Sequence, residues 1–257
     1  MKTVIFAGGM GTRISEESHL KPKPMIEIGG MPLLWHIMKI YSVYGHNEFI
    51  ICLGFKGYVI KEYFMNYFMH SSDVTIDLKD NNIEVHSTKS EDFKVTLVDT
   101  GYDTMTAGRL KRVQQYIGDN DFMLTYGDGV SDINIADLVT YHEQHNKIAT
   151  MTAIQPGSRF GIMEFDKDDA IRNFIEKPQE SGSWINGGFF VLKPDVFKYL
   201  KDDADDIMWE KQPLEDLASD NEIVAYKHTG FWKCMDTLRD REDLEQLWQT
   251  KPMWKRW

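Results

Sequence analysis

The alternation of strand-like and helix-like segments is the feature of this sequence that most constrains its fold. Residues 2–7 and 48–53 are short apolar runs typical of buried strands, whereas residues 32–44 and 57–68 carry apolar side chains at helical spacing. Strands that alternate with helices are typical of α/β folds, in which a sheet lies between layers of helices. We therefore predict an α/β fold with a mixed, mainly parallel sheet flanked by helices.

Two further segments predict small β-hairpins added to this sheet. Residues 74–78 and 83–86 are short strands around an Asp-Asn-Asn turn, and residues 161–166 and 170–175 form a similar pair. The remaining expected elements are strands at 94–98, 122–126, 148–154, 188–192 and 222–226 and helices at 104–117, 134–145 and 237–249. No linker-like stretch or internal repeat interrupts the chain, so we expect a single domain over residues 1–257.

Composition excludes several classes of function. Of 257 residues, Lys and Arg number 29 and Asp and Glu number 40, and the net charge of −11 argues against a general nucleic-acid-binding protein. An anionic ligand would need a locally positive site. The two cysteines, Cys52 and Cys234, lie far apart, which fits a reducing compartment. With no secretory leader and no apolar run of the ~18–20 residues that a membrane span needs, we expect a cytoplasmic protein without a membrane partner.

A glycine-rich loop, Ala7-Gly8-Gly9-Met10-Gly11-Thr12-Arg13, follows the first expected strand directly. Its glycines let backbone N–H groups approach an anion closely, and Thr12 and Arg13 add side-chain donors. The loop lacks the Gly-Lys-Ser/Thr of a Walker A motif, and Ile14 stands where the dinucleotide-binding fingerprint has its third glycine. A tight turn between strand and helix is the alternative interpretation of the loop taken alone.

The segment Lys21-Pro22-Lys23-Pro24 begins within ten residues of this loop. Each proline restricts its own backbone and that of the residue before it, which predicts an extended segment with pre-positioned lysines. Taken alone, such a segment is most often a solvated loop. Next to a glycine-rich anion loop, it predicts a phosphate clamp.

Two aspartates, Asp128 and Asp236, are candidate metal ligands. Asp128 lies in the segment Tyr126-Gly127-Asp128-Gly129 at the carboxyl end of an expected strand, where α/β sheets bind ligands. Asp236 ends another strand-like segment, so the two carboxylates could share one Mg²⁺ ion across adjacent strand ends. Each alone could also be a turn or capping residue, and Asp236 precedes an expected helix as an N-cap would.

Two further segments carry polar groups suited to a sugar phosphate and a nucleotide. Glu176 could accept hydrogen bonds from sugar hydroxyls, Lys177 could bind a phosphate, and the Asn186-Gly187-Gly188 turn would let a sugar ring approach the backbone. The alternative interpretation is a strand end and a β-bulge. The segment Thr104–Arg112 is typical of a helix start with several cations, either a solvated basic face or, through Arg109, a ligand contact.

Taken in this order, the motifs resemble those of the sugar-phosphate nucleotidylyltransferases, and the resemblance spans the whole chain. The narrower similarity, to family members that act as glucose-1-phosphate cytidylyltransferases, lies in residues 21–30, 99–101, 108–112 and 231–240. The resemblance implies a Rossmann-like fold of the nucleotide-diphospho-sugar transferase type. It also implies a nucleotide- and metal-binding half at 1–130, a sugar-phosphate half at 131–240 and a tail at 241–257.

The resemblance implies that CTP and α-D-glucose 1-phosphate react to give CDP-glucose and pyrophosphate, with Mg²⁺ as cofactor and a homo-oligomer, a hexamer, as the assembly. The product would feed synthesis of dideoxy sugars for bacterial surface polysaccharides such as O-antigen and lipopolysaccharide. A uridylyl- or thymidylyltransferase acting on the same sugar phosphate would share these motifs and differ only in base selection. A non-catalytic nucleotide-sugar sensor would be expected to lack one of the metal-binding aspartates or the arginine of the glycine-rich loop. This chain has Asp128, Asp236 and Arg13.

The resemblance also implies roles for individual residues. Arg13, Lys23 and Lys177 would be catalytic by stabilising phosphate charge, and Asp128 and Asp236 would hold the metal. The implied nucleotide contacts are Phe6, Ala7, Gly8, Gly9, Met10, Gly11, Thr12, Arg13, Lys23, Thr104, Arg109 and Asp128. The implied sugar-phosphate contacts are Glu176, Lys177, Asn186, Gly187 and Gly188. No general base is expected, because the second pKa of a phosphate monoester is near ~6 and the nucleophile is already an anion. Catalysis would therefore come from positioning and charge neutralisation.

The tail at 247–257 contains three of the seven tryptophans of the chain. A tryptophan is costly to leave in water. We expect the tail to pack either on its own domain or on a neighbouring subunit.

Overall fold

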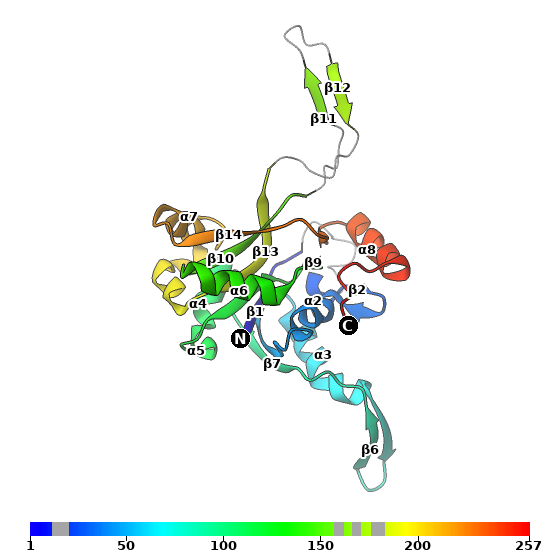
Figure 1. Cartoon of the computed structure of the whole chain (residues 1–257). Coiled ribbons are helices and arrows are strands. Elements are labelled where there is room, and N and C mark those ends of the chain that lie inside the picture. Colours follow the sequence, from blue (N-terminus) through cyan, green and yellow to red (C-terminus); the bar gives the residue numbers. More distant parts are fainter. Residues whose placement is uncertain (12–20, 157–161, 166–170, 176–182) are drawn as a thin grey trace.

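The central feature of the fold is a seven-stranded sheet with the strand order β14-β10-β13-β8-β1-β4-β7 (Figure 1). Its strands are β1 (Thr3–Phe6), β4 (Glu48–Leu53), β7 (Lys94–Asp99), β8 (Phe122–Tyr126), β10 (Ala149–Ile154), β13 (Ile185–Leu192) and β14 (Ile223–His228). Only β13 runs antiparallel to its neighbours β8 and β10; the other pairs are parallel. The computed structural model describes residues 1–11, 21–156, 162–165, 171–175 and 183–257. The prediction of a mixed, mainly parallel sheet is confirmed.

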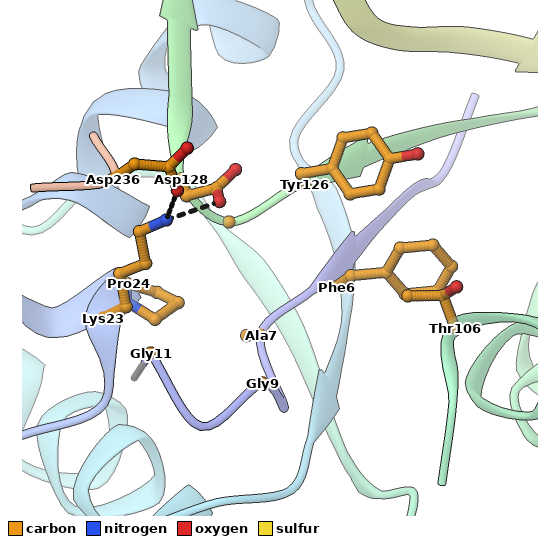
Figure 2. Close-up of a pocket in the computed structure, with 11 residues that line it drawn as sticks. Phe6, Ala7, Gly9, Gly11, Lys23, Pro24, Thr106, Tyr126, Asp128 and Asp236 are labelled. Atoms are coloured by element: carbon orange, nitrogen blue, oxygen red, sulfur yellow. Dashed lines mark hydrogen bonds and ion pairs between the residues drawn. The ribbon is translucent and has the colours of Figure 1, made fainter. Parts of the chain in front are cut away.

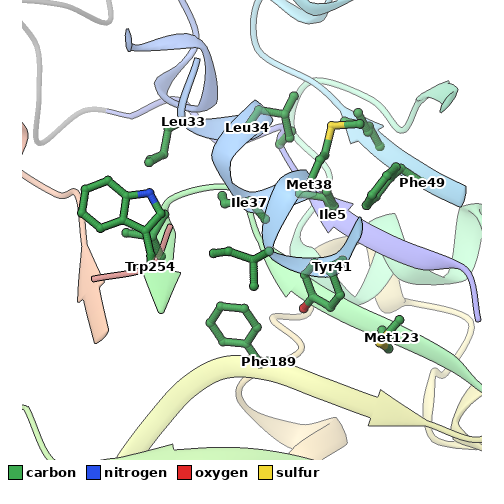
Figure 3. Close-up of a cluster of buried hydrophobic side chains, with 14 of the residues drawn as sticks. Ile5, Leu33, Leu34, Ile37, Met38, Tyr41, Phe49, Met123, Phe189 and Trp254 are labelled. Carbon is green, nitrogen blue, oxygen red and sulfur yellow. The ribbon is translucent and has the colours of Figure 1, made fainter. Parts of the chain in front are cut away.

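Helices cover both faces of this sheet. They are α2 (Leu33–Ser42), α3 (Gly57–His70), α4 (Thr106–Arg112), α5 (Gln114–Ile117), α6 (Ile135–His145), α7 (Gln212–Ser219) and α8 (Leu238–Thr250), with the short 3₁₀ helices η2 (Lys23–Met25), η3 (Pro194–Tyr199) and η4 (Ala204–Asp206). Successive side chains of a strand point to opposite faces. Accordingly Ile5 of β1 joins the core formed with α2, whereas Val4 and Phe6 join the core formed with α4. Figure 3 shows the first of these cores packed around α2.

The expected helix at 104–117 differs from the structure. It begins at Thr106 and is divided into α4 and α5 at Val113, whose φ and ψ are −95° and 0°. Gly118 ends α5 with a φ of 85°, a conformation that glycine adopts without a steric penalty. Helix α7 was not predicted, because this short segment buries only Pro213 and Leu217 and so carries little apolar pattern.

In the described part of the chain, four small two-stranded sheets accompany the main sheet. They are β2 (Glu27–Ile28) with β3 (Met31–Pro32), β5 (Ser72–Asp77) with β6 (Asn82–Thr88), β9 (Gly129–Ser131) with β15 (Trp232–Cys234), and β11 (Ile162–Phe165) with β12 (Ile171–Ile175). The β5–β6 and β11–β12 hairpins match the two hairpins predicted from the sequence, and they extend from opposite ends of the body (Figure 1). The β9–β15 pair joins segments about a hundred residues apart in the sequence. Local sequence patterns do not predict such a pairing.

The C-terminal tail packs on its own chain. Trp254 is fully buried and stacks on Phe231 with ring centroids 5.7 Å apart. The buried imidazole of His36 contacts Trp254 and Trp248 and bonds through Nε2 to the carbonyl oxygen of Ile28 at 2.8 Å. The first of the two expectations for the tail is therefore confirmed. Within the described residues, no helix is both long and apolar enough to cross a membrane.

Candidate active site

A pocket of about 240 Å³ opens where the main sheet ends, beside the glycine-rich loop (Figure 2). Its lining comes from the carboxyl ends of β1 and β8, the loop after β1, turn η2, the start of α4 and the segment before α8. The lining residues are Phe6, Ala7, Gly9, Gly11, Lys23, Pro24, Thr106, Tyr126, Gly127, Asp128 and Asp236. The carboxyl ends of parallel strands are the usual ligand-binding edge of α/β sheets. The sequence motifs of the first half of the chain therefore meet at one site.

The glycine-rich loop is held by backbone hydrogen bonds to the neighbouring strand. The N–H of Ala7 donates to the carbonyl oxygen of Cys52 at 3.0 Å, and Gly8 accepts from the N–H of Phe55 at 3.1 Å. A Cβ on Gly8 would lie 2.2 Å from Nη1 of Arg109, so any other residue there would displace the guanidinium group. The Cβ position of Gly9 meets no atom within 4 Å, which leaves this part of the loop open to a ligand.

Arg109 lies directly beneath this loop and is only 4% exposed. Its Nη1 donates to the carbonyl oxygens of Leu53 and Gly101, and its Nη2 to that of Gly8, over 2.9–3.1 Å. Burial lowers the pKa of the guanidinium below its usual value. Arg109 therefore supports the loop from below, and its contact with a nucleotide stays a prediction. Thr104 is also buried, and it does not line the pocket. Thr106, which the sequence analysis did not propose as a site residue, lines the pocket instead.

The other two cations of this segment, in the last turn of α4, face acidic partners. Lys111 bonds to Asp202, and Arg112 pairs with Asp205, in the segment around η4. The two basic residues therefore dock the last turn of α4 onto that acidic segment. The residue before α4 is fixed to the same segment, because the N–H of Met105 donates to the carbonyl oxygen of Asp205 at 2.7 Å.

Lys23 lies between the two candidate metal ligands (Figure 2). Its Nζ is 2.8 Å from Oδ2 of Asp128 and 2.6 Å from Oδ1 of Asp236. Burial by itself lowers the pKa of Lys23, but the charge of Asp128 and the hydrogen bonds to both carboxylates outweigh it and raise the pKa.

The backbone at Lys23 differs from the extended segment that the sequence predicted. Lys23 begins turn η2, because the N–H groups of Met25 and Ile26 donate backbone hydrogen bonds that close this turn.

The two aspartates come together through strand pairing. Asp128 follows β8, and Asp236 follows β15, which pairs with β9 rather than with a strand of the main sheet. The N–H of Met235 also donates to the carbonyl oxygen of Asp128 at 2.8 Å. The sequence predicted adjacent strand ends, and the structure places them in a two-stranded sheet separate from the main sheet. The N-cap of α8 is Thr237 in a capping box, so Asp236 is not that cap.

The donor set of this cluster fits a divalent cation. One carboxylate oxygen each from Asp128 and Asp236 and the Sγ of Cys234 lie within 4.8 Å of one another. Carboxylate oxygens are the protein ligands that Mg²⁺ prefers in phosphate sites. The ammonium group of Lys23 already occupies the point where both carboxylates converge, which shows that the geometry suits a positive charge. Burial and the nearby charge of Asp128 raise the pKa of the Cys234 thiol, so its sulfur is a poorer donor than the two carboxylates.

A second pocket, of about 220 Å³, adjoins the first along Tyr126, Asp128 and Asp236, which line both. Gly188 has a φ of 82°, and a Cβ there would lie 2.6 Å from the Tyr126 ring. Asn186 accepts from the N–H of Gly188 at 2.8 Å and donates to the Tyr126 hydroxyl at 3.2 Å. The indole N–H of Trp232, a residue to which the sequence analysis assigned no role, donates to the carbonyl oxygen of Gly187 at 2.7 Å. The Asn186-Gly187-Gly188 turn therefore forms one wall of this second pocket.

Four predicted site residues lie outside the described residues: Thr12, Arg13, Glu176 and Lys177. Met10 is exposed beside the first pocket but does not line it. The sequence analysis did not propose Tyr126 as a site residue, although it lines both pockets. Its position at a strand end, just before Gly127 and Asp128, could have indicated this role.

Residues 2–237 match the sequence family described as Nucleotidyl transferase. The chain belongs to this family. It is 54% identical over 259 aligned residues to the glucose-1-phosphate cytidylyltransferase of Salmonella typhimurium, with 100% of both chains covered. It is 45% identical over 258 residues to a probable glucose-1-phosphate cytidylyltransferase of Bacillus subtilis, again with 100% of both covered. Both similarities agree with the family inferred from the motifs.

Solved structures of similar fold extend this comparison. A putative glucose-1-phosphate thymidylyltransferase from Bacillus anthracis superposes with a TM-score of 0.71 at 17% identity, covering 97% of this chain and 96% of the other. A UDP-glucose pyrophosphorylase in complex with UDP-glucose gives a TM-score of 0.70 at 18% identity, covering 97% and 98%. Because these identities are low, the two structures are evidence for a shared fold alone. They confirm the expected nucleotide-diphospho-sugar transferase fold for this chain.

Proposed function

We propose that this member of the nucleotidyl transferase family transfers the cytidylyl group of CTP to α-D-glucose 1-phosphate, giving CDP-glucose and pyrophosphate. The observation that carries the proposal is the 54% identity, over the full length of both chains, to a protein named for this activity. The arrangement of the two adjoining pockets supports it, because a nucleotide and a sugar phosphate need separate places that meet at the reacting phosphates.

The shared residues indicate where the reacting groups would meet. Asp128 and Asp236 line both pockets, so the border between the pockets lies at the carboxylate pair and Lys23. The nucleotide would occupy the pocket beside the glycine-rich loop, with its phosphates toward the loop N–H groups and Lys23. The sugar would occupy the pocket lined by the Asn186-Gly187-Gly188 turn.

The chemistry would rest on charge and position. The phosphate of the sugar is already an anion near pH 7, so this chain needs no base to activate it. Its attack on the α-phosphorus of CTP, opposite the leaving pyrophosphate, brings two polyanions together, and the ammonium of Lys23 offsets part of that repulsion. A divalent ion is general in this family. We propose Mg²⁺ held by Asp128 and Asp236, where it would neutralise phosphate charge and orient the phosphates when bound.

The remaining assignments follow the same family. We propose that Arg13 and Lys177 also stabilise phosphate charge, that Thr12 contacts the nucleotide, and that Glu176 contacts the sugar. We also propose that residues 1–130 and 131–240 form the nucleotide and sugar-phosphate halves of one domain. The chain would work as a hexamer in the cytoplasm, supplying CDP-glucose for surface polysaccharide synthesis.

The experiment that tests this proposal is pyrophosphate release with glucose 1-phosphate and Mg²⁺, using CTP, UTP, dTTP, ATP and GTP in turn. Strong preference for CTP is the expected result. Preference for UTP or dTTP would retain the mechanism and overturn the base assignment. Release with none of the five, by protein that binds CTP, would contradict the proposed reaction.

A further inference from the structure

The first pocket has two chemically different ends. Figure 2 shows Lys23 and the two aspartates toward one end, and Phe6, Tyr126 and Thr106 toward the other. The rings of Phe6 and Tyr126 have their centroids 6.0 Å apart. The charged end suits the phosphates of a nucleotide, so the aromatic end is left for its base.

Aromatic rings hold a base without identifying it, because every base has a face that stacks on them. A polar group must therefore select the base at this end of the pocket. The Tyr126 hydroxyl bonds to the side-chain amide of Asn186 at 3.2 Å, and Asn186 lines the second pocket. Among the described side chains that line the aromatic end, this leaves the Thr106 hydroxyl as the group that can meet a base.

Thr106 is fixed in the pocket wall by backbone bonds on both sides of it. The N–H of Met105 donates to the carbonyl oxygen of Asp205 at 2.7 Å. The N–H of Ala107 donates to the carbonyl oxygen of Ile207 at 3.1 Å. The segment around η4 therefore sets the position of Thr106 at the start of α4.

The Thr106 hydroxyl is itself held by two hydrogen bonds. It donates to Oε2 of Glu210 at 2.8 Å, and it accepts from the N–H of Trp209 at 2.7 Å. A hydroxyl group has one proton to donate and two lone pairs that accept. The proton is committed to a carboxylate, which is the stronger kind of acceptor, and one lone pair is committed to Trp209. One lone pair remains, so Thr106 can offer a base only an acceptor.

We propose that Thr106 selects the base by accepting a hydrogen bond from the amino group of cytosine. At ring position 4 cytosine carries an amino group, which donates, whereas uracil and thymine carry a carbonyl oxygen, which accepts. A carbonyl oxygen would face the remaining lone pair acceptor to acceptor. The hydroxyl could turn its proton toward uracil only by giving up its bond to Glu210. The inference rests on the proposed function and names the residue that sets its nucleotide specificity.

The test measures the ratio of kcat/KM for CTP to kcat/KM for UTP, at saturating glucose 1-phosphate and Mg²⁺. Thr106→Val removes the hydroxyl and keeps the shape of the side chain, whereas Thr106→Ser keeps the hydroxyl. The matched control is Thr140→Val, the same change at an exposed threonine of α6. Calorimetry gives the dissociation constants of CTP and UTP for each variant, and thermal unfolding reports its folding.

The CTP-to-UTP ratio should fall by about 10- to 100-fold in Thr106→Val, the effect of losing one hydrogen bond to a group that is otherwise left unpaired. A merely structural loss would lower both kcat/KM values alike and leave their ratio unchanged. Thr106→Ser should stay close to the wild-type ratio, because its hydroxyl can make the same bonds. Thr140→Val should match the wild type.

An unchanged ratio in folded Thr106→Val would overturn the inference and leave the proposed function standing, as would an equal fall in Thr106→Ser. If Thr106→Val does not fold, Thr106→Cys gives the same comparison, because sulfur is a weak acceptor. A wild-type protein that transfers no cytidylyl group would refute the proposed function alone. The dissociation constants of CTP and UTP would then decide the role of Thr106 by the same comparison of variants.

Discussion

Replacing Lys23 by methionine is predicted to have opposite effects on metal binding and on turnover. The ammonium group bridges Asp128 and Asp236 at 2.8 and 2.6 Å with a side chain that is only 11% exposed. A divalent ion that uses these carboxylates must displace it. A hydrogen bond to a charged group contributes about 1.5–3 kcal/mol. Solvent screening reduces this, because both aspartates are partly exposed. We take about 3 kcal/mol for the two contacts together.

A competition of about 3 kcal/mol corresponds to about a hundredfold in a dissociation constant, since 1.4 kcal/mol is tenfold. Lys23→Met should therefore bind Mg²⁺ or Mn²⁺ up to ~100-fold more tightly than the wild type. Turnover should fall by at least ~10²-fold, the effect of losing one transition-state donor. Calorimetric metal titration and pyrophosphate release measure the two quantities.

Lys21→Met is the matched control, because Lys21 pairs with Glu27 near the surface and lies two residues away on the same segment. Its metal affinity should equal that of the wild type. Unchanged metal affinity in Lys23→Met would refute the competition, and near-normal turnover would remove Lys23 from the mechanism.

Four further predictions follow from the same structure. Trp254→Ala should lose about 3–5 kcal/mol of stability and about 6–20 °C in Tm. The more exposed Met253→Ala should change little, and an unchanged Tm for Trp254→Ala would contradict the buried tail. Burial lowers the pKa of His36 to about 4, so stability should be full above its unfolded pKa near 6.5 and fall by about 3 kcal/mol as the pH drops toward 4. Urea unfolding across this range should lose that slope in His36→Gln. Asp236→Asn should lower turnover by at least ~10²-fold and weaken metal binding, and equal metal affinity would exclude it as a ligand. Arg109→Met should loosen the loop held at Gly8 and raise the KM for the nucleotide by about tenfold, with initial rates as the measurement.

Much of the fold could be predicted because its signals are local. The buried strand at 48–53, the strand at 122–126 and the hairpin around 78–82 all depend on neighbouring side chains, and each prediction lies within a few residues of the observed element. Helix α7 and the break at Val113 could not be predicted in this way. Both depend on what the segment packs against, which the sequence pattern does not record.

The candidate site divides along the same line. The motifs identified Lys23, Asp128 and Asp236 by residue type and by their place after expected strands. They could not show that Lys23 bridges the two carboxylates, because Asp128 lies 105 positions and Asp236 lies 213 positions after Lys23 in the sequence. For Arg109 the sequence predicted a contact with the ligand. The structure instead shows its guanidinium group under the glycine-rich loop, bonded to the carbonyl oxygen of Gly8.

The sequence by itself determined the α/β class, the family and the residue types that this chemistry requires, because these depend on local pattern and on motif order. The tertiary structure alone decided how those residues meet. The pairing of β9 with β15 brings Asp236 to Asp128, and the packing of α4 brings Arg109 under the carbonyl oxygen of Gly8. Such contacts form only when distant segments bury their apolar faces together, and that burial is a property of the whole folded chain.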